Sequence, residues 1–320
     1  MLARRSRRRY RPPLVRSGQE AATALAVDIG GTKLAVGRVS DDGRVLARAQ
    51  IPTPVGRGPD DAETMWRALA ELVAAVREGD ELVCGVGCGG PMSPAGVEVS
   101  PLNIPAWRRF PLRDRLAAET GLPVHVDNDA KALALGEGWV GAARGRRNYL
   151  AMVVSTGVGG GIVVDGQLLG GATGNAGHIG HVIVEPDGRE CGCGARGCLE
   201  AEASGSAIRA MTGRPPADAD PAVRRRTGVL VGRAVASVVS LLDLRLAVVA
   251  GSVALGYGDT FFAAAQRELE HRARLSYTEG ARIVPAGLGD AGPLVGAAAV
   301  GLRGLGRLDP VGRDPVGGAP

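Results

Sequence analysis

The sequence predicts an α/β fold made of two related halves. Short apolar segments of strand length alternate with longer segments in which apolar residues recur at helical spacing. Several of the strand-like segments run directly into glycine turns, and two of those turns share one design about 120 residues apart. The 320 residues, 45% of them apolar, are enough for two domains or one large domain.

The first glycine turn follows an apolar strand predicted over residues 24–27. It reads D-I-G-G-T-K over residues 28–33, and a β-hairpin is expected over residues 34–50. Glycines let backbone N–H groups approach phosphate oxygens, the Thr32 hydroxyl adds a donor, and the Asp28 carboxylate is suited to Mg²⁺, usually through water. The pattern favours a nucleotide-phosphate site, with a tight β-turn that holds no ligand as the alternative.

The next segments complete the first half. A helix that starts at Pro59 carries an apolar stripe, and a strand over residues 82–86 leads into another glycine-rich turn over residues 87–92. Residues 102–110 form an irregular loop whose amide and indole groups are suited to a polyol. Trp107 in this loop is equally suited to covering the core.

A group of polar residues follows the last strand of this half. A strand over residues 124–126 ends in Asp127-Asn128-Asp129, and a helix continues through Gly136. The carboxyl ends of strands are where α/β folds place their sites, so Asp129 is the candidate catalytic base. The alternative is that Asp127 or Asp129 only caps the helix.

The second half opens with a copy of the first glycine turn. A strand over residues 149–154 leads into Ser155-Thr156, and the glycine-rich residues 157–161 turn the chain back into a strand over residues 162–164. One such turn is a weak signal. Two of them indicate two related halves that hold one polyphosphate between them.

The rest of the second half contains a third junction of strand and glycine. Helices are expected over residues 201–211 and 229–242, and a strand over residues 246–250 ends at Gly251. This junction opens onto a helix around residues 261–275 and is suited to a nucleoside.

One short segment near the middle of the chain holds two of the four histidines and three of the five cysteines. Thiolates bind Zn²⁺ strongly, and a tetrahedral Cys3His site needs four ligands that converge. Cys191, Cys193 and Cys198 form a glycine-rich loop, and His181 can fold back onto it across a short strand over residues 182–184. Because protein fills all four places, we expect a structural zinc. Three free thiols in a glycine loop are the alternative.

His178 and Glu200 flank these four residues and are not needed as ligands. Polar groups held beside a metal-tied loop are suited to hydrogen bonding with the hydroxyls of a small ligand. The alternative is a surface histidine and a glutamate that caps a helix.

The formal charge of +5 arises at the amino-terminal end. Residues 1–20 hold seven Arg and one Glu, and the remaining chain has 31 basic and 32 acidic residues. A disordered tail or an overlong predicted start is therefore favoured over a nucleic-acid-binding arm. No apolar run reaches the roughly 20 residues that span a bilayer, and the Arg-rich start lacks an apolar continuation. We expect a soluble cytoplasmic protein with no membrane partner.

Several motifs occur in an order and spacing that resembles the ROK family of sugar kinases and sugar-responsive repressors. They are D-I-G-G-T-K, N-D-A, S-T-G-V-G-G-G, G-H-x-G-H and C-G-C-G-x-x-G-C-x-E-A-x-A-S-G, roughly between Ala24 and Gly304. The resemblance implies an actin-like (ribonuclease-H-like, hexokinase-type) fold, with two α/β domains and an interdomain cleft. We expect the domains over residues 24–128 and 129–304, with a last helix able to pack back on the first domain, between disordered tails over residues 1–23 and 305–320.

The resemblance also implies roles for single residues. Asp129 would deprotonate the sugar hydroxyl, and Mg²⁺ would accompany ATP. The positions expected at ATP are Asp28, Gly30, Gly31, Thr32, Lys33, Thr156, Gly157, Gly159, Gly160 and Gly251, the last near the nucleoside. The positions expected at the sugar are Gly90, Asn103, Asn128, Asp129, His178, His181 and Glu200. His181 would ligate zinc through one ring nitrogen and bind sugar with the other.

His178 departs from the family pattern. Many members, glucokinases among them, carry Glu at this position, whereas a histidine resembles bacterial N-acetylmannosamine kinases. Imidazole can donate or accept a hydrogen bond where a carboxylate only accepts, so the preferred substituent near C1 and C2 of the sugar should change. A second departure is Lys131, where Asn is common, and a third is a short loop over residues 213–228.

These features predict an ATP-dependent sugar kinase that phosphorylates the primary (6-) hydroxyl of a hexose or N-acetylhexosamine, with N-acetylmannosamine favoured. ATP and polyphosphate both fit as donors, and the resemblance implies a homodimer. The alternatives are a glucokinase of the same family and a sugar-sensing transcriptional regulator. Such regulators carry a DNA-binding domain before the first phosphate loop, and only 23 residues precede Ala24, so a nucleic-acid partner is disfavoured.

Overall fold

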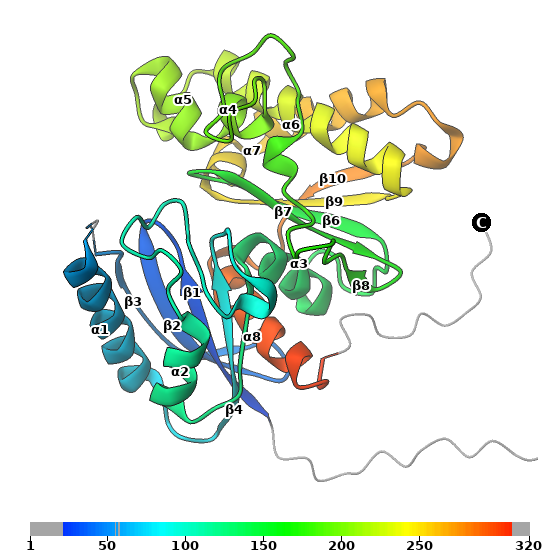
Figure 1. Ribbon diagram of the computed structural model, residues 1–320. Coiled ribbons are helices and arrows are strands. Elements are labelled where there is room, and N and C mark those ends of the chain that lie inside the picture. Colours follow the sequence, from blue (N-terminus) through cyan, green and yellow to red (C-terminus); the bar gives the residue numbers. More distant parts are fainter. Residues whose placement is uncertain (1–21, 55, 57, 309–320) are drawn as a thin grey trace, which may run out of the picture.

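The computed structural model describes residues 22–54, 56 and 58–308, which contain two five-stranded sheets (Figure 1). The first has the order β3-β2-β1-β4-β5, and the second has the corresponding order β8-β7-β6-β9-β10. Their strands are β1 (Thr23–Ile29), β2 (Lys33–Ser40), β3 (Val45–Pro52), β4 (Glu81–Cys88), β5 (Val124–Asn128), β6 (Tyr149–Val154), β7 (Val158–Val164), β8 (Gln167–Leu168), β9 (Leu246–Ala250) and β10 (Arg282–Pro285). Each sheet combines an antiparallel hairpin edge with three parallel strands, so the two halves share one topology.

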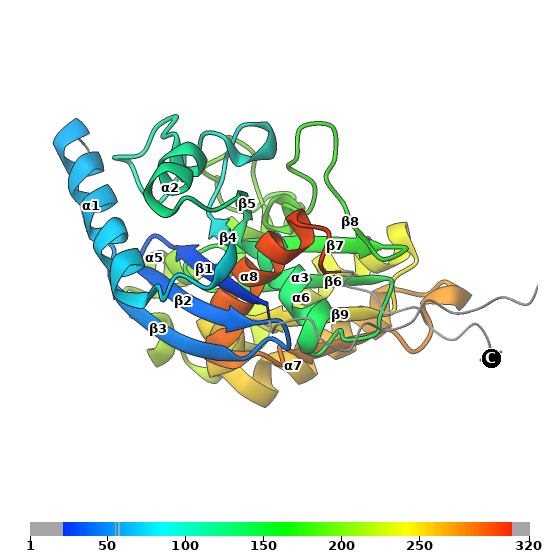
Figure 2. The ribbon, with the colours of Figure 1, turned by 90° about the horizontal axis from the view of Figure 1, so that it is seen from below.

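Two helices, α3 (Asp129–Val140) and α8 (Gly292–Gly304), lie between the sheets in both views (Figures 1 and 2). Helix α8 packs on β1 and β4, α3 packs on β6 and β7, and the helices pack on each other. Their contact is close because glycines meet there: a Cβ at Gly296 would lie 2.6 Å from the Ala132 carbonyl oxygen, and one at Gly136 would lie 3.0 Å from the Gly296 nitrogen. The two sheets are therefore joined through backbone packing.

The outer faces of the sheets carry the remaining helices. Helices α1 (Pro59–Val76) and α2 (Leu112–Thr120) pack on the first sheet. The second sheet is covered by α4 (Leu199–Ala203), α5 (Gly205–Thr212), α6 (Pro221–Leu242) and α7 (Ser252–Arg272) (Figure 1). Short 3-10 turns connect the elements: η1 (Pro94–Gly96), η2 (Ile179–His181), η3 (Pro216–Asp218), η4 (Ser276–Thr278) and η5 (Gly289–Ala291).

Strand β1 shows how the sequence sets the two sides of the first sheet. Its large residues, Leu25, Val27 and Ile29, join the core under α1 and α2, whereas Ala24 and Ala26 face α8. Successive side chains of a strand point to opposite faces, so small residues on one face allow α8 to approach closely. One face of the sheet therefore carries large apolar residues under α1 and α2, and the other carries small residues on which α8 packs closely.

Trp107 belongs to the core and not to a sugar-contacting surface. Its side chain is fully buried, its ring stacks on Phe110 at 4.2 Å between centroids, and its Nε1 donates to the Ala62 carbonyl at 3.3 Å. The indole N–H is satisfied inside the protein, so a polyol contact by Trp107 is excluded.

Several predicted elements differ from the structure. The glycine run was expected to be a turn as far as residue 161, but β7 already begins at Val158. The reason is packing: a Cβ at Gly161 would lie 2.7 Å from the Ala134 Cβ, so this glycine lets α3 lie on the strand. The predicted strand over residues 182–184 is reduced to a single bridge between Ile183 and Cys198.

The predicted helix over residues 201–211 is two helices, because Ser204 ends α4 and its side chain accepts a hydrogen bond from the Ala207 N–H at the start of α5. Helix α6 begins earlier than expected, at Pro221, since Asp220 caps it. Strand β10 was not predicted. Its four residues are too few to show a period.

The ends of the described chain bear on the predicted tails. Residues 1–21 and 309–320 of those tails lie outside the described residues, and β1 begins at Thr23. The predicted carboxyl-terminal tail is wrong for residues 305–308, because Leu305 and Leu308 pack against the core near α8. No helix among the described residues combines the length and apolarity needed to cross a membrane. The predicted domain limits stay a prediction.

Candidate functional site

Asp28 and Asp129 both lie near Gly87, at the edge where parallel strands of the first sheet end. Asp28 on β1 pairs in register with Gly87 on β4, and Gly87 pairs with Asp127 on β5. A Cβ at Gly87 would lie 3.8 Å from the Asp28 Oδ1 atom and 3.7 Å from the Asp129 Cα atom. Gly87 therefore borders a small space that Asp28 and Asp129 also border.

The surroundings disfavour ionisation of both carboxyl groups. Burial, followed by the nearby Asp129, raises the pKa of Asp28 to about 7, and the Lys33 ammonium opposes this shift. Burial of the carboxyl among protein atoms also raises the pKa of Asp129, although the residue as a whole keeps an exposed surface that a substrate can reach. A buried carboxyl whose ionisation is disfavoured by a neighbouring carboxylate forms a place that a hard cation would stabilise.

Asp28→Asn is expected to stabilise the ligand-free protein more at pH 8 than at pH 5. The folded-state pKa of about 7 lies above the ordinary value of 3.8, so between these values the folded protein keeps a proton that the unfolded chain has lost. Stability is therefore lost as pH rises from about 4 to about 7, and Asn removes that loss. Melting temperatures of both proteins at pH 5, 6 and 8 without Mg²⁺ test this. A pH-independent difference would contradict the raised pKa.

The first glycine turn lies beside Asp28 and touches the loop that carries Asn103. The Gly30 N–H donates to the Lys33 carbonyl at 3.0 Å, which closes the turn. A Cβ at Gly31 would lie 2.6 Å from the Asn103 Cβ, so glycine is required for this approach. Gly31, Thr32 and Asn103 are exposed. The predicted phosphate turn and one predicted sugar residue thus form one continuous edge.

The second glycine turn is held by the start of α5 and by Glu200. The Thr156 carbonyl accepts from both the backbone N–H and the hydroxyl of Ser206, at 3.2 and 2.9 Å. Glu200 accepts at Oε2 from the Val158 N–H at 2.8 Å, and a Cβ at Gly157 would lie 2.8 Å from the same oxygen. Glu200, which is predicted to bind the sugar, is therefore hydrogen-bonded to the backbone of the second glycine turn, which is predicted to bind phosphate.

Gly159 and Gly160 lie within β7. A Cβ at Gly159 would lie 2.9 Å from the Ala130 Cβ, and one at Gly160 would lie 2.9 Å from the Ile179 Cγ2 atom. The Gly159 contact places the amino-terminal end of α3, and with it Asp129, against the second sheet, and the Gly160 contact does the same for η2. The phosphate role of these two glycines stays a prediction.

A cavity of about 580 Å³ lies beside the second glycine turn and has the size of a small-molecule site. Residues from the turn, α5, η3 and α7 line it, among them Thr156, Ser206, Arg209, Pro216, Ser252 and Tyr257. Gly251 starts α7 with φ +99°, and a Cβ there would lie 2.3 Å from the Val154 carbonyl oxygen. The sequence pointed to Gly251 but missed Ser206, Arg209 and Tyr257, which come from helices with no recognisable motif.

Gly90, Asn128 and His178 converge at the sugar side of the predicted site. A Cβ at Gly90 would lie 3.7 Å from the Asn128 Nδ2 atom and 4.0 Å from the His178 Nε2 atom. Asn128 is the N-cap of α3, and its Oδ1 accepts from the Ala130 N–H at 3.0 Å, which also donates to the Asp129 Oδ1 atom at 2.8 Å. The His178 Nδ1 atom lies 2.9 Å from a backbone carbonyl, so Nε2 is the ring nitrogen turned toward Gly90.

His181, Cys191, Cys193 and Cys198 form the group expected for zinc. Their ligand atoms all lie within 4.8 Å of one another. The His181 Nδ1 atom is 3.7 Å from the Cys191 sulfur, and the Cys193 and Cys198 sulfurs are 3.8 Å apart. Ligands at ~2.3 Å from a tetrahedral Zn²⁺ are ~3.8 Å apart, so this donor set fits the ion in number, type and spacing.

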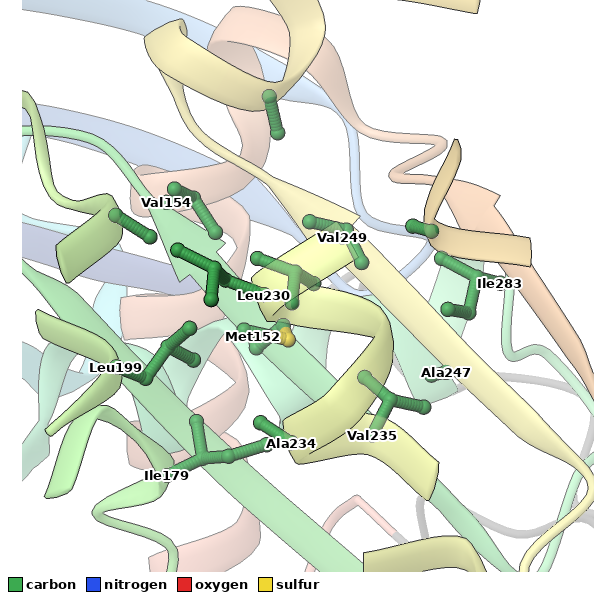
Figure 3. Packing of buried hydrophobic residues seen from close by; sticks show 14 of the residues in the cluster. Met152, Val154, Ile179, Leu199, Leu230, Ala234, Val235, Ala247, Val249 and Ile283 are labelled. Atoms are coloured by element: carbon green, nitrogen blue, oxygen red, sulfur yellow. The ribbon is translucent and has the colours of Figure 1, made fainter. Parts of the chain in front are cut away.

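Two buried apolar side chains, Ile179 and Leu199, stand next to metal-binding residues in the sequence and are labelled in Figure 3. Ile179, between the two histidines, and Leu199, directly after Cys198, both pack in the core of the second sheet with Met152 and Leu230. Each apolar side chain points inward and leaves its polar neighbours at the surface of the core. The sequence between them is free to form the cysteine loop.

Glu202 supports the cysteine loop, and no sequence pattern pointed to it. The carboxylate is 2% exposed, accepts from the Arg189 backbone N–H at 2.6 Å, and pairs with the Arg189 and Arg226 guanidinium groups at 3.0 and 2.6 Å. It ties the loop to α6. A buried carboxylate with two arginine partners is a structural support whose removal would leave two cations unpaired.

Known proteins resemble this chain along most of its length. The profile described as ROK family matches residues 24–303. A glucokinase of Thermotoga maritima is 45% identical over 188 residues, which cover 58% of this chain and 58% of that protein. An N-acetylmannosamine kinase of Citrobacter koseri is 39% identical over 251 residues, which cover 74% of this chain and 85% of that protein.

Solved structures give the same result for the fold. A ROK family glucokinase from Streptomyces griseus in complex with glucose and AMPPNP is 31% identical, with a TM-score of 0.76 over 89% of this chain and 100% of that one. A ROK hexokinase from Thermus thermophilus is 34% identical, with a TM-score of 0.71 over 89% and 99%. The predicted actin-like two-domain fold and the predicted resemblance are confirmed. The chain belongs to the ROK family.

Proposed function

We propose that the protein is an ATP-dependent sugar kinase that phosphorylates the primary (6-) hydroxyl of a hexose or N-acetylhexosamine, with N-acetylmannosamine favoured. The observation that carries the proposal is the placement of Asp28 and Asp129 around Gly87, beside the glycine turns of both sheets. Phosphoryl transfer needs alignment and charge neutralisation more than covalent chemistry, and this arrangement offers both.

Asp129 is the proposed general base. Its exposed carboxylate can reach a substrate hydroxyl, and its raised pKa moves it toward the pH range in which a base accepts a proton efficiently. Asp28 is the residue that would hold Mg²⁺ near the phosphates, usually through water, and the ion would supply neutralisation of phosphate charge. The Gly30 N–H closes the first glycine turn, so the Gly31 and Thr32 N–H groups and the Lys33 charge are proposed to bind the same phosphates.

The nucleoside is proposed to occupy the cavity beside the second glycine turn. Thr156 at the turn lies on the phosphate side, and Pro216 and Tyr257 give the cavity apolar surface for a base. The Tyr257 hydroxyl donates to the Pro216 carbonyl at 2.9 Å, so the two sides of this surface are bonded to each other. Gly251, at the start of α7, is close to the turn through Val154.

The sugar is proposed to bind between the two halves. The Asn128 amide and the His178 Nε2 atom converge near Gly90 from β5 and from the segment before η2. His181 uses Nδ1 toward the cysteines, which leaves Nε2 for a sugar hydroxyl. We propose that the Cys3His group holds a structural Zn²⁺, since four protein ligands leave no open position.

Two observations favour N-acetylmannosamine over glucose. His178 replaces a carboxylate with a group that can donate a hydrogen bond, and the Citrobacter koseri kinase is matched over 85% of its length. Glucokinase is the second candidate, because the Thermotoga maritima glucokinase has the higher identity, 45% over a shorter span. The homodimer and the cytoplasmic location remain expectations from the family resemblance.

N-acetylmannosamine is expected to give the highest kcat/KM in an ADP-release assay across glucose, mannose, N-acetylglucosamine and N-acetylmannosamine. His178→Glu is expected to shift the ratio of kcat/KM values toward glucose by about 10-fold or more, since one hydrogen-bond mismatch at a sugar contact is worth that much. The KM for ATP serves as the control and should stay within twofold. A wild-type preference for glucose that His178→Glu leaves unchanged would remove the basis for N-acetylmannosamine.

A further inference from the structure

Lys131 is a buried cation whose partners link two sides of the site. The residue is 4% exposed and lies in the first turn of α3, two positions after Asp129. Its Nζ atom donates to the Gly174 carbonyl at 2.9 Å and lies 3.4 Å from the Asp127 carboxylate. An ammonium group buried to this extent needs such partners, so the residue bridges α3, the end of β5 and the segment around Gly174.

The segment over residues 170–175 has no side chain in the core. All six residues are exposed, and Gly174 has φ +86°. The Ala176 N–H donates to the Gly170 carbonyl at 3.0 Å, which closes the segment on itself. The charge-assisted bond from Lys131 instead joins this segment to a helix, and such bonds are shorter and stronger than neutral ones.

The residue after Gly174 holds the imidazole of His178. The Asn175 carbonyl lies 2.9 Å from the His178 Nδ1 atom, which turns the other ring nitrogen toward Gly90 and Asn128. A continuous series of bonds therefore leads from Lys131 through the backbone of Gly174 and Asn175 to His178. The Asn128 N–H donates to the Asp127 carboxylate at 2.8 Å, so the ammonium is also tied to the other polar residue of the sugar side.

We propose that Lys131 is a positioning residue: it holds residues 170–177 so that His178 faces the sugar at a fixed distance from Asn128. This rests on the proposed function, because His178 is assigned to the sugar there. Lys131 touches no substrate in this scheme, and its effect on the reaction passes through the backbone of the segment.

Lys131→Met keeps the length of the side chain and removes the charge. Hydrogen exchange of the Ala176 amide, which donates to the Gly170 carbonyl within the segment, is expected to become about 10-fold faster in the ligand-free protein. The KM for the sugar is expected to rise about 10-fold, with kcat and the KM for ATP within twofold. Lys131→Arg, which keeps a cation, should retain most of the protection. The double variant Asp127→Asn/Lys131→Met leaves no unpaired carboxylate and replaces the single variant if that one does not fold.

Tyr149→Phe is the matched control. It removes a buried hydrogen bond of 2.7 Å from β6 to the Ala134 carbonyl on the same helix α3, without touching residues 170–177. It should lower stability and leave both the exchange of this segment and the sugar KM unchanged. Unchanged exchange in the Lys131 variants, or the same behaviour as Tyr149→Phe, would overturn the positioning role. Faster exchange with an unchanged sugar KM would instead overturn the assignment of His178 to the sugar.

Discussion

Asp129→Asn is expected to lower kcat by about 10³-fold while the affinity for the sugar stays within about twofold. A general base contributes roughly 10²–10⁴ to the rate, and Asn cannot accept the proton of the hydroxyl. The amide has the shape of the carboxylate and can still hydrogen-bond a hydroxyl, so binding should survive. The raised pKa of Asp129 and its exposed position at the start of α3 are the features on which this expectation depends.

The measurement combines ADP release with calorimetric titration of the sugar. Asp127→Asn is the control, because Asp127 lies two residues away at the end of β5 and is paired with Lys131. Its kcat at saturating sugar should remain within a few-fold of the wild-type value. A kcat for Asp129→Asn close to that of the wild type would show that another group, or none, accepts the proton.

Replacement of Cys193 by Ser is expected to lower the melting temperature by about 10 °C or more and to abolish zinc binding. Three of the four ligands come from one loop, and His181 comes from an earlier segment. Metal binding therefore stabilises the fold that brings them together, and the loss of a ligand lowers the free energy of unfolding. The change should concentrate on the segment that carries His181 and Glu200. Treatment of the wild-type protein with a chelator should have the same effect.

Metal analysis and thermal melts test this prediction together. The wild type should contain one zinc ion per chain, and Cys193→Ser should contain much less than one. Cys84→Ser is the control, since Cys84 is fully buried in β4 of the first sheet and lies in a different core. It should keep its zinc. A metal-free wild type whose melting is unaffected by a chelator would rule out the structural zinc.

The main sheet strands could be predicted because each one is short, apolar and followed by a turn with an obvious composition. This holds for β1, β4, β6 and β9, whose residues are almost all buried. The prediction failed where glycines serve packing between elements, as Gly161 does against Ala134. A run of glycines looks the same in the sequence whether it forms a turn or lets a helix pack closely on a strand. Which of the two occurs depends on the element that lies next to it in space.

The residues of the candidate site also fall into those that the sequence could predict and those that it could not. The four metal-binding residues lie in one short segment, so their grouping could be predicted from their spacing. Asp129 could be predicted because it follows the end of a strand. The lining of the nucleotide cavity could not, since Ser206 and Tyr257 are brought together by the packing of α5 and α7 on the second sheet. The hydrogen bond between Glu200 and the Val158 N–H could not be predicted either, because it joins residues 42 positions apart in the sequence.

The contact between α3 and α8 bears on the distance between the two halves that form the candidate site. Gly136 and Gly296 meet backbone against backbone, and Gly85 of the first sheet lies so close to α8 that a Cβ there would be 1.9 Å from the Ala297 carbonyl oxygen. The distance between the two halves is thus set partly by main-chain atoms, beside the side chains that pack around both helices. A side chain at any of these three glycines would crowd a neighbouring backbone, although none of the three belongs to the candidate site.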